Sequence, residues 1–258
     1  MMKKKLIFFD LDDTLLKKDK SVSNNTLKVL ELLKKQGNKI IIATARNKIS
    51  TMPLVDLLKP DYTIINAGAY IIDNNKNVIR SLLISKETSL KIINEIFKEI
   101  KTLSIQTDDI LYTNEMYDKG PVRTYYDFKD FKGIDCYKIL VKDLKLEKGK
   151  ELGIKHNLDF ENYFGGRWSR FSHIESTKAK ALEFITEYEK MSLDDTIAFG
   201  DDYGDIAMLQ ASGIGVAVGN ALEDVKKEAK YICDNADDDG VARFLDNYFN
   251  LGVYSGGN

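Results

Sequence analysis

Short apolar runs alternate with amphipathic stretches at both ends of the chain, and this alternation restricts the fold more than any other feature. Residues 4–10 and 39–44 are apolar runs of strand length, and residues 24–36 between them place leucines at helical spacing before a glycine. Near the C-terminal end, a helical pattern over 177–190 again precedes an apolar run at 196–199. Strands separated by helices of this length predict a parallel sheet with helices on both faces.

The middle of the chain has a different texture. A helix is predicted over residues 85–101, and mainly strand-like segments follow it, with a further helix predicted over 147–155. This mixture is typical of an α+β domain rather than of a regular alternation. We therefore predict an α/β protein with a discontinuous core, formed by residues 1–82 and 172–258, and an inserted α+β cap domain over residues 83–171.

Charge and composition exclude several classes of protein. The 38 basic and 40 acidic residues give a net charge of −2. The chain therefore lacks the excess of basic residues that is typical of nucleic-acid-binding proteins. The apolar run that follows the N-terminal lysines ends at Asp10, which is too short for a secretory signal or a membrane span. Two cysteines and two histidines are too few for a disulfide framework or a soft-metal site. We expect a reduced, cytoplasmic protein that binds neither membranes nor nucleic acids.

Three acidic residues follow the first predicted strand. Asp10 stands at the end of the strand, and Asp12 and Asp13 come directly after Leu11. In open α/β sheets, ligands bind beyond the carboxyl ends of the strands. Carboxylates crowded there repel one another unless a hard cation such as Mg²⁺ binds between them, often together with a phosphate. The simpler alternative is that Asp12, Asp13 and Thr14 only cap a following turn.

Three further segments place phosphate- or metal-binding side chains at similar positions. Thr44 ends the second predicted strand, where its hydroxyl can donate to a phosphoryl oxygen or merely cap the next helix. Lys178 lies in the first turn of a predicted helix, where the helix dipole disfavours a cation unless an anionic partner is near. Asp201 and Asp205 follow a third strand, as a metal site or as a solvated acidic loop.

Together and in this order, the Asp-x-Asp-x-Thr turn at 10–14, the strand-end Thr44, the helix-start Lys178 and the Gly-Asp loop at 200–205 resemble the haloacid dehalogenase superfamily of phosphatases. The large insertion after the second motif, and the segment 66–69 before a predicted hairpin, resemble the Cof-type branch of that superfamily. The resemblance covers essentially the whole chain. It implies a Rossmann-like core, a mobile α/β cap, and Mg²⁺-dependent hydrolysis of small phosphate monoesters, often sugar phosphates.

The resemblance also implies roles for individual residues. Asp10 would be the nucleophile and a Mg²⁺ ligand, and Asp12 the general acid/base that also binds the metal through its main-chain carbonyl. The remaining roles would be phosphate binding for Thr44, Ala45 and Lys178, metal binding for Asp201, and support of the metal through water or a second-layer contact for Asp205. Such chains usually have glycine where Ala45 and Ala179 stand, and often asparagine at Gly204. An asparagine commonly helps to bind phosphate, so Gly204 predicts weakened affinity.

Two expectations concern proton transfer and specificity. Asp12 must be protonated when it meets the leaving group, so we expect partial burial beside Asp10 to raise its pKa. Arg46 and Asn66, on core loops, are candidate substrate-binding residues. Within the predicted cap, the candidate specificity residues near the returning hinge are Trp168, Arg170 and His173, although a structural role is the simpler interpretation of each.

Three other functions compete with a monoester phosphatase. A phosphosugar mutase uses the same motifs but returns the phosphoryl group to its substrate. A weakly active phosphate-ligand binding protein would be consistent with Gly204. A response-regulator-like receiver also combines acids, a hydroxyl and a lysine, but that fold is about half this length and has no insertion. In each enzymatic case the partner is a small phosphorylated metabolite, and we expect a monomer or a weak homodimer.

Overall fold

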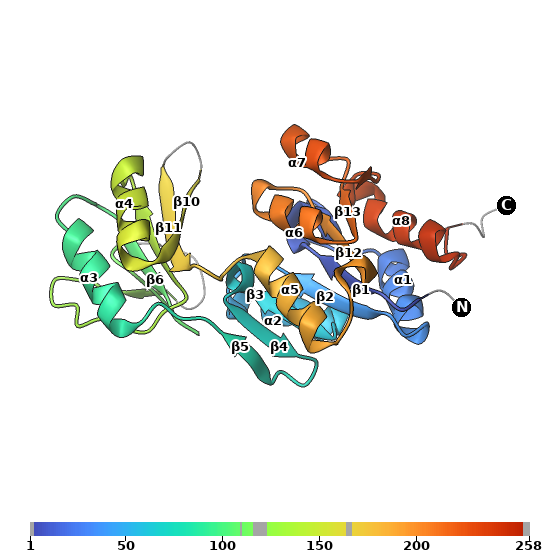
Figure 1. Ribbon diagram of the computed structural model, residues 1–258, viewed down its shortest axis with the longest axis horizontal. Helices are drawn as coiled ribbons and strands as arrows, with labels where there is room; N and C mark the ends of the chain where they lie inside the picture. Colours follow the sequence, from blue (N-terminus) through green and yellow to red (C-terminus); the bar gives the residue numbers. More distant parts are fainter. Residues whose placement is uncertain (1–2, 109, 116–122, 164–166, 255–258) are drawn as a thin grey trace. The chain divides into compact units, whose positions relative to one another are not determined.

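The computed structural model describes residues 3–108, 110–115, 123–163 and 167–254, and it divides into two compact units (Figure 1). The first unit consists of Met1–Arg46, Thr51–Ile79 and Thr177–Asn258, and the second of Asn47–Ser50 and Arg80–Ser176. Each unit contains its own cluster of buried apolar side chains. In the part of the chain that the structure describes, no helix is long and apolar enough to cross a membrane.

The described residues of the first unit form an eight-stranded sheet in the order β14-β13-β12-β1-β2-β3-β4-β5. Neighbouring strands from β14 to β3 are parallel, and β4 is antiparallel to β3, so the predicted parallel core is confirmed. The strands are β1 (Leu6–Phe9), β2 (Lys39–Ala43), β3 (Tyr62–Ile65), β4 (Tyr70–Asp73), β5 (Val78–Ser81), β12 (Thr196–Gly200), β13 (Ile214–Ala217) and β14 (Tyr231–Ile232).

Helices connect most of these strands. They are α1 (Asn24–Lys35), α2 (Lys48–Leu58), α5 (Lys178–Tyr188), α6 (Ile206–Ala211), α7 (Glu223–Glu228) and α8 (Gly240–Phe249). Helix α1 packs against α8, and α5 packs against α6. Helix α1 begins where the Ser23 side chain accepts from the Thr26 N–H, and it ends before Gly37, whose φ of +85° favours glycine. Helix α2 has no counterpart among the predicted helices, and it carries Pro53 in its interior.

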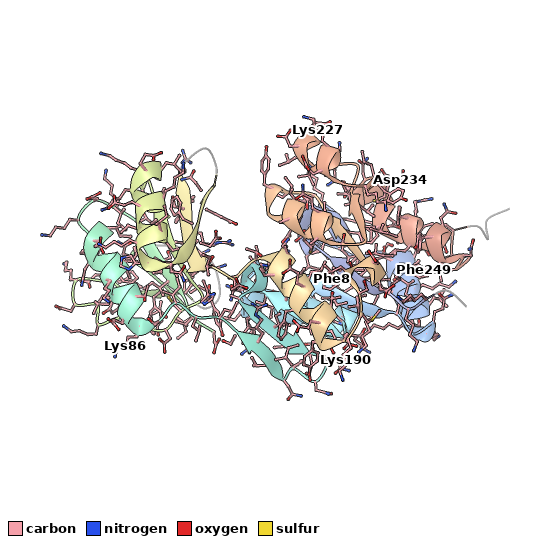
Figure 2. All side chains as sticks on the ribbon, in the orientation of Figure 1. Phe8, Lys86, Lys190, Lys227, Asp234 and Phe249 are labelled. Atoms are coloured by element: carbon pink, nitrogen blue, oxygen red, sulfur yellow. The ribbon has the colours of Figure 1, made fainter. Side chains whose placement is uncertain are left out.

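Strand β1 lies at the centre of the first unit. All its residues are buried, and it pairs with β12 on one side and with β2 on the other. Phe8, labelled in Figure 2, is buried on this strand, whereas the labelled lysines Lys86, Lys190 and Lys227 are exposed. Because β12, β1 and β2 are parallel neighbours, their carboxyl ends lie side by side at one edge of the sheet.

The described residues of the second unit form a six-stranded sheet in the order β10-β11-β9-β6-β7-β8. Helices α3 and α4 pack against each other, and their apolar side chains share one core with β6, β9 and β11. The predicted helix over 85–101 is shorter in the structure, and the sequence patterns did not indicate β8 or β10. The elements are α3 (Lys86–Ile96), β6 (Leu103–Gln106), β7 (Leu111–Thr113), β8 (Arg123–Tyr125), β9 (Lys138–Lys142), α4 (Leu146–His156), β10 (Leu158–Tyr163) and β11 (Trp168–His173).

Candidate active site

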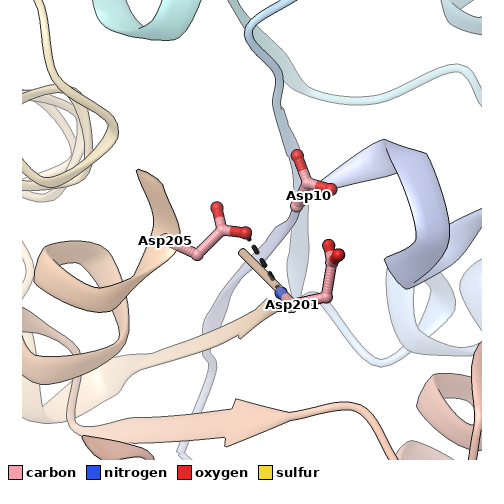
Figure 3. A group of neighbouring side chains, drawn as sticks. All are labelled: Asp10, Asp201 and Asp205. Atoms are coloured by element: carbon pink, nitrogen blue, oxygen red, sulfur yellow. Dashed lines mark hydrogen bonds between the residues drawn. The ribbon is translucent and has the colours of Figure 1, made fainter. Parts of the chain in front are cut away.

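Three carboxylates gather where β1 and β12 end. Asp10 follows β1 directly, and its N–H donates to the carbonyl of Phe199 on β12 over 3.0 Å. Carboxylate oxygens of Asp10, Asp201 and Asp205 all lie within 4.8 Å of one another, and Figure 3 shows them converging on one space. The parallel pairing of β1 with β12 therefore brings together acids that are nearly 200 positions apart in the chain.

The loop after β12 holds Asp205 in this cluster. One carboxylate oxygen of Asp205 accepts from the backbone N–H groups of Asp201 and Asp202 over 3.1 and 3.2 Å. Gly200 makes this approach possible, because a Cβ atom there would lie 2.4 Å from the Cβ of Asp205. The hydroxyl of Thr14 donates to Asp201 over 2.7 Å, which fixes the third carboxylate from the side of the acidic turn.

Lys178 is the cation of the cluster. Its Nζ lies 2.5 Å from Asp10 Oδ1 and 2.6 Å from Asp205 Oδ1, and all three side chains are buried. Helix α5 presents this lysine from its first residue, directly after Thr177, whose hydroxyl accepts from the Lys180 N–H. A lysine ammonium carries three N–H donors, so one donor remains for a further anion such as a phosphoryl oxygen.

Burial shifts the pKa values of these groups. Burial raises the pKa of Asp10 to about 8, although Lys178 opposes the shift. Burial likewise raises the pKa of Asp201 to about 6 against the hydrogen bond from Thr14. Burial alone would lower the pKa of Lys178, but the carboxylates of Asp10 and Asp205 hold it above its ordinary value. Without a cation, these crowded carboxylates retain protons near neutral pH. A hard cation that takes oxygen ligands would replace those protons and stabilise the ionised carboxylates.

Asp12 has a different environment from the one predicted. Arg46 forms a two-point ion pair with it, from Nε to Oδ2 over 2.7 Å and from Nη2 to Oδ1 over 2.6 Å. The hydrogen bond from Arg46 holds the pKa of Asp12 below its ordinary value, against the effect of burial. The expectation of a raised pKa for Asp12 is therefore wrong, because sequence patterns do not show that a guanidinium lies against this carboxylate.

A tight turn at residues 66–68 contacts both the end of β2 and the start of α5. The Thr44 hydroxyl accepts from the Arg46 N–H over 3.1 Å, and the Thr44 carbonyl accepts from the Ala67 N–H over 2.9 Å. Asn66 is buried in this turn, and Ala45 is exposed beside Thr44. Gly68 has a φ of +116°, and a Cβ atom there would lie 2.3 Å from the carbonyl oxygen of Thr177. The turn therefore places Thr44 and the N-terminus of α5 in one structure.

Comparison with known proteins identifies the family. The model of the haloacid dehalogenase-like hydrolases matches residues 7–245, which is most of the chain. The chain belongs to this family. The resemblance drawn from the four motifs is therefore confirmed, and so is the conclusion that the chain is an enzyme.

Individual hydrolases of the family are similar over nearly their full length. A 5-amino-6-(5-phospho-D-ribitylamino)uracil phosphatase of Bacillus subtilis is 29% identical over 95% of this chain and 98% of its own. A pyridoxal phosphate phosphatase of Escherichia coli is 24% identical over 95% of this chain and 98% of its own. The structure of a haloalkanoate-superfamily phosphatase from Bacteroides thetaiotaomicron superimposes with a TM-score of 0.81 and 25% identity, over 97% of this chain and 96% of that one.

The candidate specificity residues of this hydrolase lie on strand β11 in the second unit. Arg170 is buried, with Nη2 2.9 Å from the carboxylate of Glu161, and the Trp168 ring has Lys142 Nζ 5.6 Å from its centre. His173 Nδ1 accepts from the backbone N–H of Glu175. These contacts are all within the second unit and agree with structural roles, so any part of these residues in specificity stays a prediction.

Gly204, where this hydrolase departs from the common pattern, occupies open space. A Cβ atom added there would meet no atom within 4 Å, and its φ lies outside the left-handed region. A side chain is therefore tolerated, because neither the space nor the backbone conformation requires glycine. We expect Gly204→Asn to leave the melting temperature unchanged and to strengthen vanadate binding by up to about tenfold, the value of one added hydrogen bond to a charged group. Unchanged vanadate inhibition in the folded variant would contradict a lost phosphate contact.

Proposed function

We propose that this hydrolase is a Mg²⁺-dependent phosphatase that cleaves small phosphate monoesters, with sugar phosphates as the preferred class. The observation that carries the proposal is the buried Lys178 between Asp10 and Asp205, beside the carboxylate of Asp201. Both curated relatives named above act on phosphate esters of small molecules, one of them on a phosphorylated ribityl chain. The acidic group at the site, Asp10, Asp201 and Asp205, offers carboxylate oxygens, which fits Mg²⁺.

The residues divide the reaction into two displacements. In the first, a carboxylate oxygen of Asp10 attacks phosphorus, the bond to the leaving oxygen breaks, and Asp12 gives its proton to that oxygen. In the second, a water molecule attacks the aspartyl-phosphate, its proton goes to Asp12, and the carboxylate of Asp10 is released with inorganic phosphate. Arg46 keeps the pKa of Asp12 low in the structure. Asp12 therefore takes up its proton when the negative charge of the bound phosphate raises that pKa. It regains from water the proton that it gives to the leaving oxygen, so protons balance.

The remaining groups offset charge and hold the phosphoryl group in line. Asp10, Asp201 and the main-chain carbonyl of Asp12 would hold Mg²⁺, with Asp205 in support, and the ion would supply neutralisation of the phosphoryl charge. The third donor of Lys178 and the Thr44 hydroxyl bind the non-bridging oxygens, with the exposed residue Ala45 beside them. The structural support for this assignment is that these groups come from adjoining strand ends and from the helix that the turn at residues 66–68 joins to β2.

The test is a panel of phosphate esters incubated with Mg²⁺, with release of inorganic phosphate measured for each. We expect hydrolysis of p-nitrophenyl phosphate and of several sugar phosphates, with stoichiometric phosphate release. A phosphosugar mutase would instead isomerise a hexose phosphate without net release, which ¹³C or ³¹P NMR of the products distinguishes. Tight binding of the esters without turnover of any of them would favour the binding-protein alternative and overturn the proposal.

A further inference from the structure

Two cations from different parts of the first unit converge on Asp12. Besides the two-point pair with Arg46, Oδ1 of Asp12 lies 3.0 Å from Lys20 Nζ. Oδ1 therefore contacts both cations, whereas Oδ2 accepts only the Arg46 Nε–H of the two. A carboxylate offers about four lone-pair positions, so Oδ2 keeps one position that neither cation occupies. The two cations thus restrain the Asp12 carboxylate and leave part of its hydrogen-bonding capacity unused.

The backbone holds Arg46 in place. Its N–H donates to the hydroxyl of Thr44 over 3.1 Å, and its carbonyl accepts from the Asn66 N–H over 2.9 Å. The guanidinium uses one edge, Nε and Nη2, for Asp12. A planar two-point pair restricts both the position and the rotation of a carboxylate, which one ammonium cannot do. Substrate binding by Arg46 stays a prediction, whereas its pairing with Asp12 is present in the structure.

Lys20 reaches Asp12 from a short turn. The Lys20 N–H donates to the carbonyl of Lys17 over 2.8 Å, and its φ of +66° turns the chain back. Lys17 anchors this turn, since its Nζ lies 3.0 Å from a carboxylate oxygen of Asp239. The side chain of Lys20 is 48% exposed and that of Asp12 is 39% exposed. The contact of Lys20 with Asp12 is therefore weaker than the contact of Arg46 with Asp12.

Asp12 itself stands in irregular backbone. It has extended torsions of −71° and 123° inside the turn Leu11–Leu15, and the next residue, Asp13, has a φ of +60°. No regular helix or strand fixes the direction of the side chain there, and a partly exposed aspartate can adopt several rotamers. Cations on both sides can supply the restraint that the backbone does not.

We propose that Arg46 and Lys20 are positioning residues, which hold the carboxylate of Asp12 where it transfers a proton to the leaving group. This inference rests on the proposed function, because it concerns the efficiency of Asp12 as an acid. It predicts that the two cations matter in proportion to how much the leaving group needs a proton. A group that binds the phosphoryl part of the substrate would matter equally for every ester.

The experiment compares kcat/KM for two substrates that share the phosphoryl group, since kcat/KM covers the steps up to the aspartyl-phosphate. p-Nitrophenolate leaves as a stable anion, whereas the alkoxide of glycerol phosphate needs a proton. For Arg46→Ala we expect kcat/KM to fall about tenfold to hundredfold with glycerol phosphate. With p-nitrophenyl phosphate we expect a fall of less than about threefold. For Lys20→Ala we expect a selective fall of about two- to fivefold with glycerol phosphate, as for an exposed pair.

Conservative variants and a matched control complete the design. Lys20→Arg keeps the cation and should restore the wild-type ratio of the two substrates, whereas Arg46→Lys loses the two-point pair and should restore it only in part. Lys76→Ala is the control, because Lys76 also has a φ of +66°, is 52% exposed and pairs with an exposed aspartate, Asp56, over 2.8 Å. That variant should leave the ratio unchanged.

The outcomes separate the inference from the function on which it rests. If the wild-type protein with Mg²⁺ hydrolyses neither ester, the proposed function is wrong and the positioning role is lost with it. If the wild type hydrolyses both, and Arg46→Ala lowers kcat/KM equally for both, then Arg46 binds the phosphoryl group and the positioning role is overturned. Should Arg46→Ala fail to fold, the exposed Lys20→Ala variant decides, because an unchanged substrate ratio there contradicts the inference.

Discussion

Replacing Asp10 by asparagine is expected to lower kcat for p-nitrophenyl phosphate by at least about a thousandfold while the protein stays folded. The amide keeps the shape of the side chain but is a poor nucleophile, so the first displacement fails. The amide cannot form the ion pair with Lys178 at 2.5 Å, although its oxygen can still accept a hydrogen bond. Circular dichroism and melting temperature establish that the fold persists.

The neighbouring acid provides the control for this variant. Asp13 is 52% exposed and has a φ of +60°, which asparagine also tolerates. Asp13→Asn should therefore leave kcat within about threefold of the wild type. If Asp13→Asn were inactive and Asp10→Asn active, the motif would be read in the wrong register. Rapid quenching in acid adds a second readout, because only chains with an intact Asp10 should retain phosphate covalently.

The placement of the acids could be predicted from the sequence because it follows from topology. An apolar strand that ends in Asp10 and a later strand followed by Asp201 must both expose their acids at the carboxyl edge if they lie in one parallel sheet. The structure pairs β1 with β12 and so brings these residues together. Neither step needs knowledge of side-chain contacts, only of strand length, helix length and the handedness of the connections.

The environment of Asp12 could not be predicted in the same way. The contact with Arg46 spans 34 positions and depends on the torsions of an irregular turn, and the contact of Lys20 depends on a residue with positive φ. Apolar periodicity carries no information about either. The sequence pattern therefore predicts that burial raises the pKa of Asp12, whereas the Arg46 guanidinium, which the pattern does not reveal, lowers it.

Helix α2 illustrates a different limit. Residues 48–58 include Ser50, Thr51 and Pro53, which disfavour a helix interior. The buried residues Thr51, Val55 and Leu58 lie on one face, but Thr51 is polar and the apolar Leu57 is exposed, so apolar residues do not mark that face. The side chain of Asn47 accepts from the Ser50 N–H over 3.0 Å, a local capping contact, but an asparagine alone is too common to indicate a helix start. Tertiary packing decides such a segment, and a single sequence does not display it.

Removing divalent metal is the second change with a large expected effect. EDTA should abolish hydrolysis of every ester in the panel, and excess Mg²⁺ should restore it, because carboxylates alone would repel a dianionic phosphate. Activity that survives EDTA, or that returns only with Zn²⁺, would contradict a site built from Asp10, Asp201 and Asp205. Metal binding at these carboxylates also predicts an effect on the stability of the protein, which can be measured without turnover.

That prediction follows from the sign of the pKa shifts. In the metal-free protein the pKa of Asp10 is raised from 3.8 to about 8 and that of Asp201 from 3.8 to about 6. Their contribution to stability is therefore complete below pH 3.8 and is lost as the pH rises through about 6 and about 8. Mg²⁺ needs both carboxylates ionised, and it stabilises the folded state in proportion to its occupancy. The rise in melting temperature on adding Mg²⁺ should thus be larger at pH 8 than at pH 5.5 and should shrink in Asp10→Asn, and an equal rise at both pH values would contradict metal binding at these carboxylates.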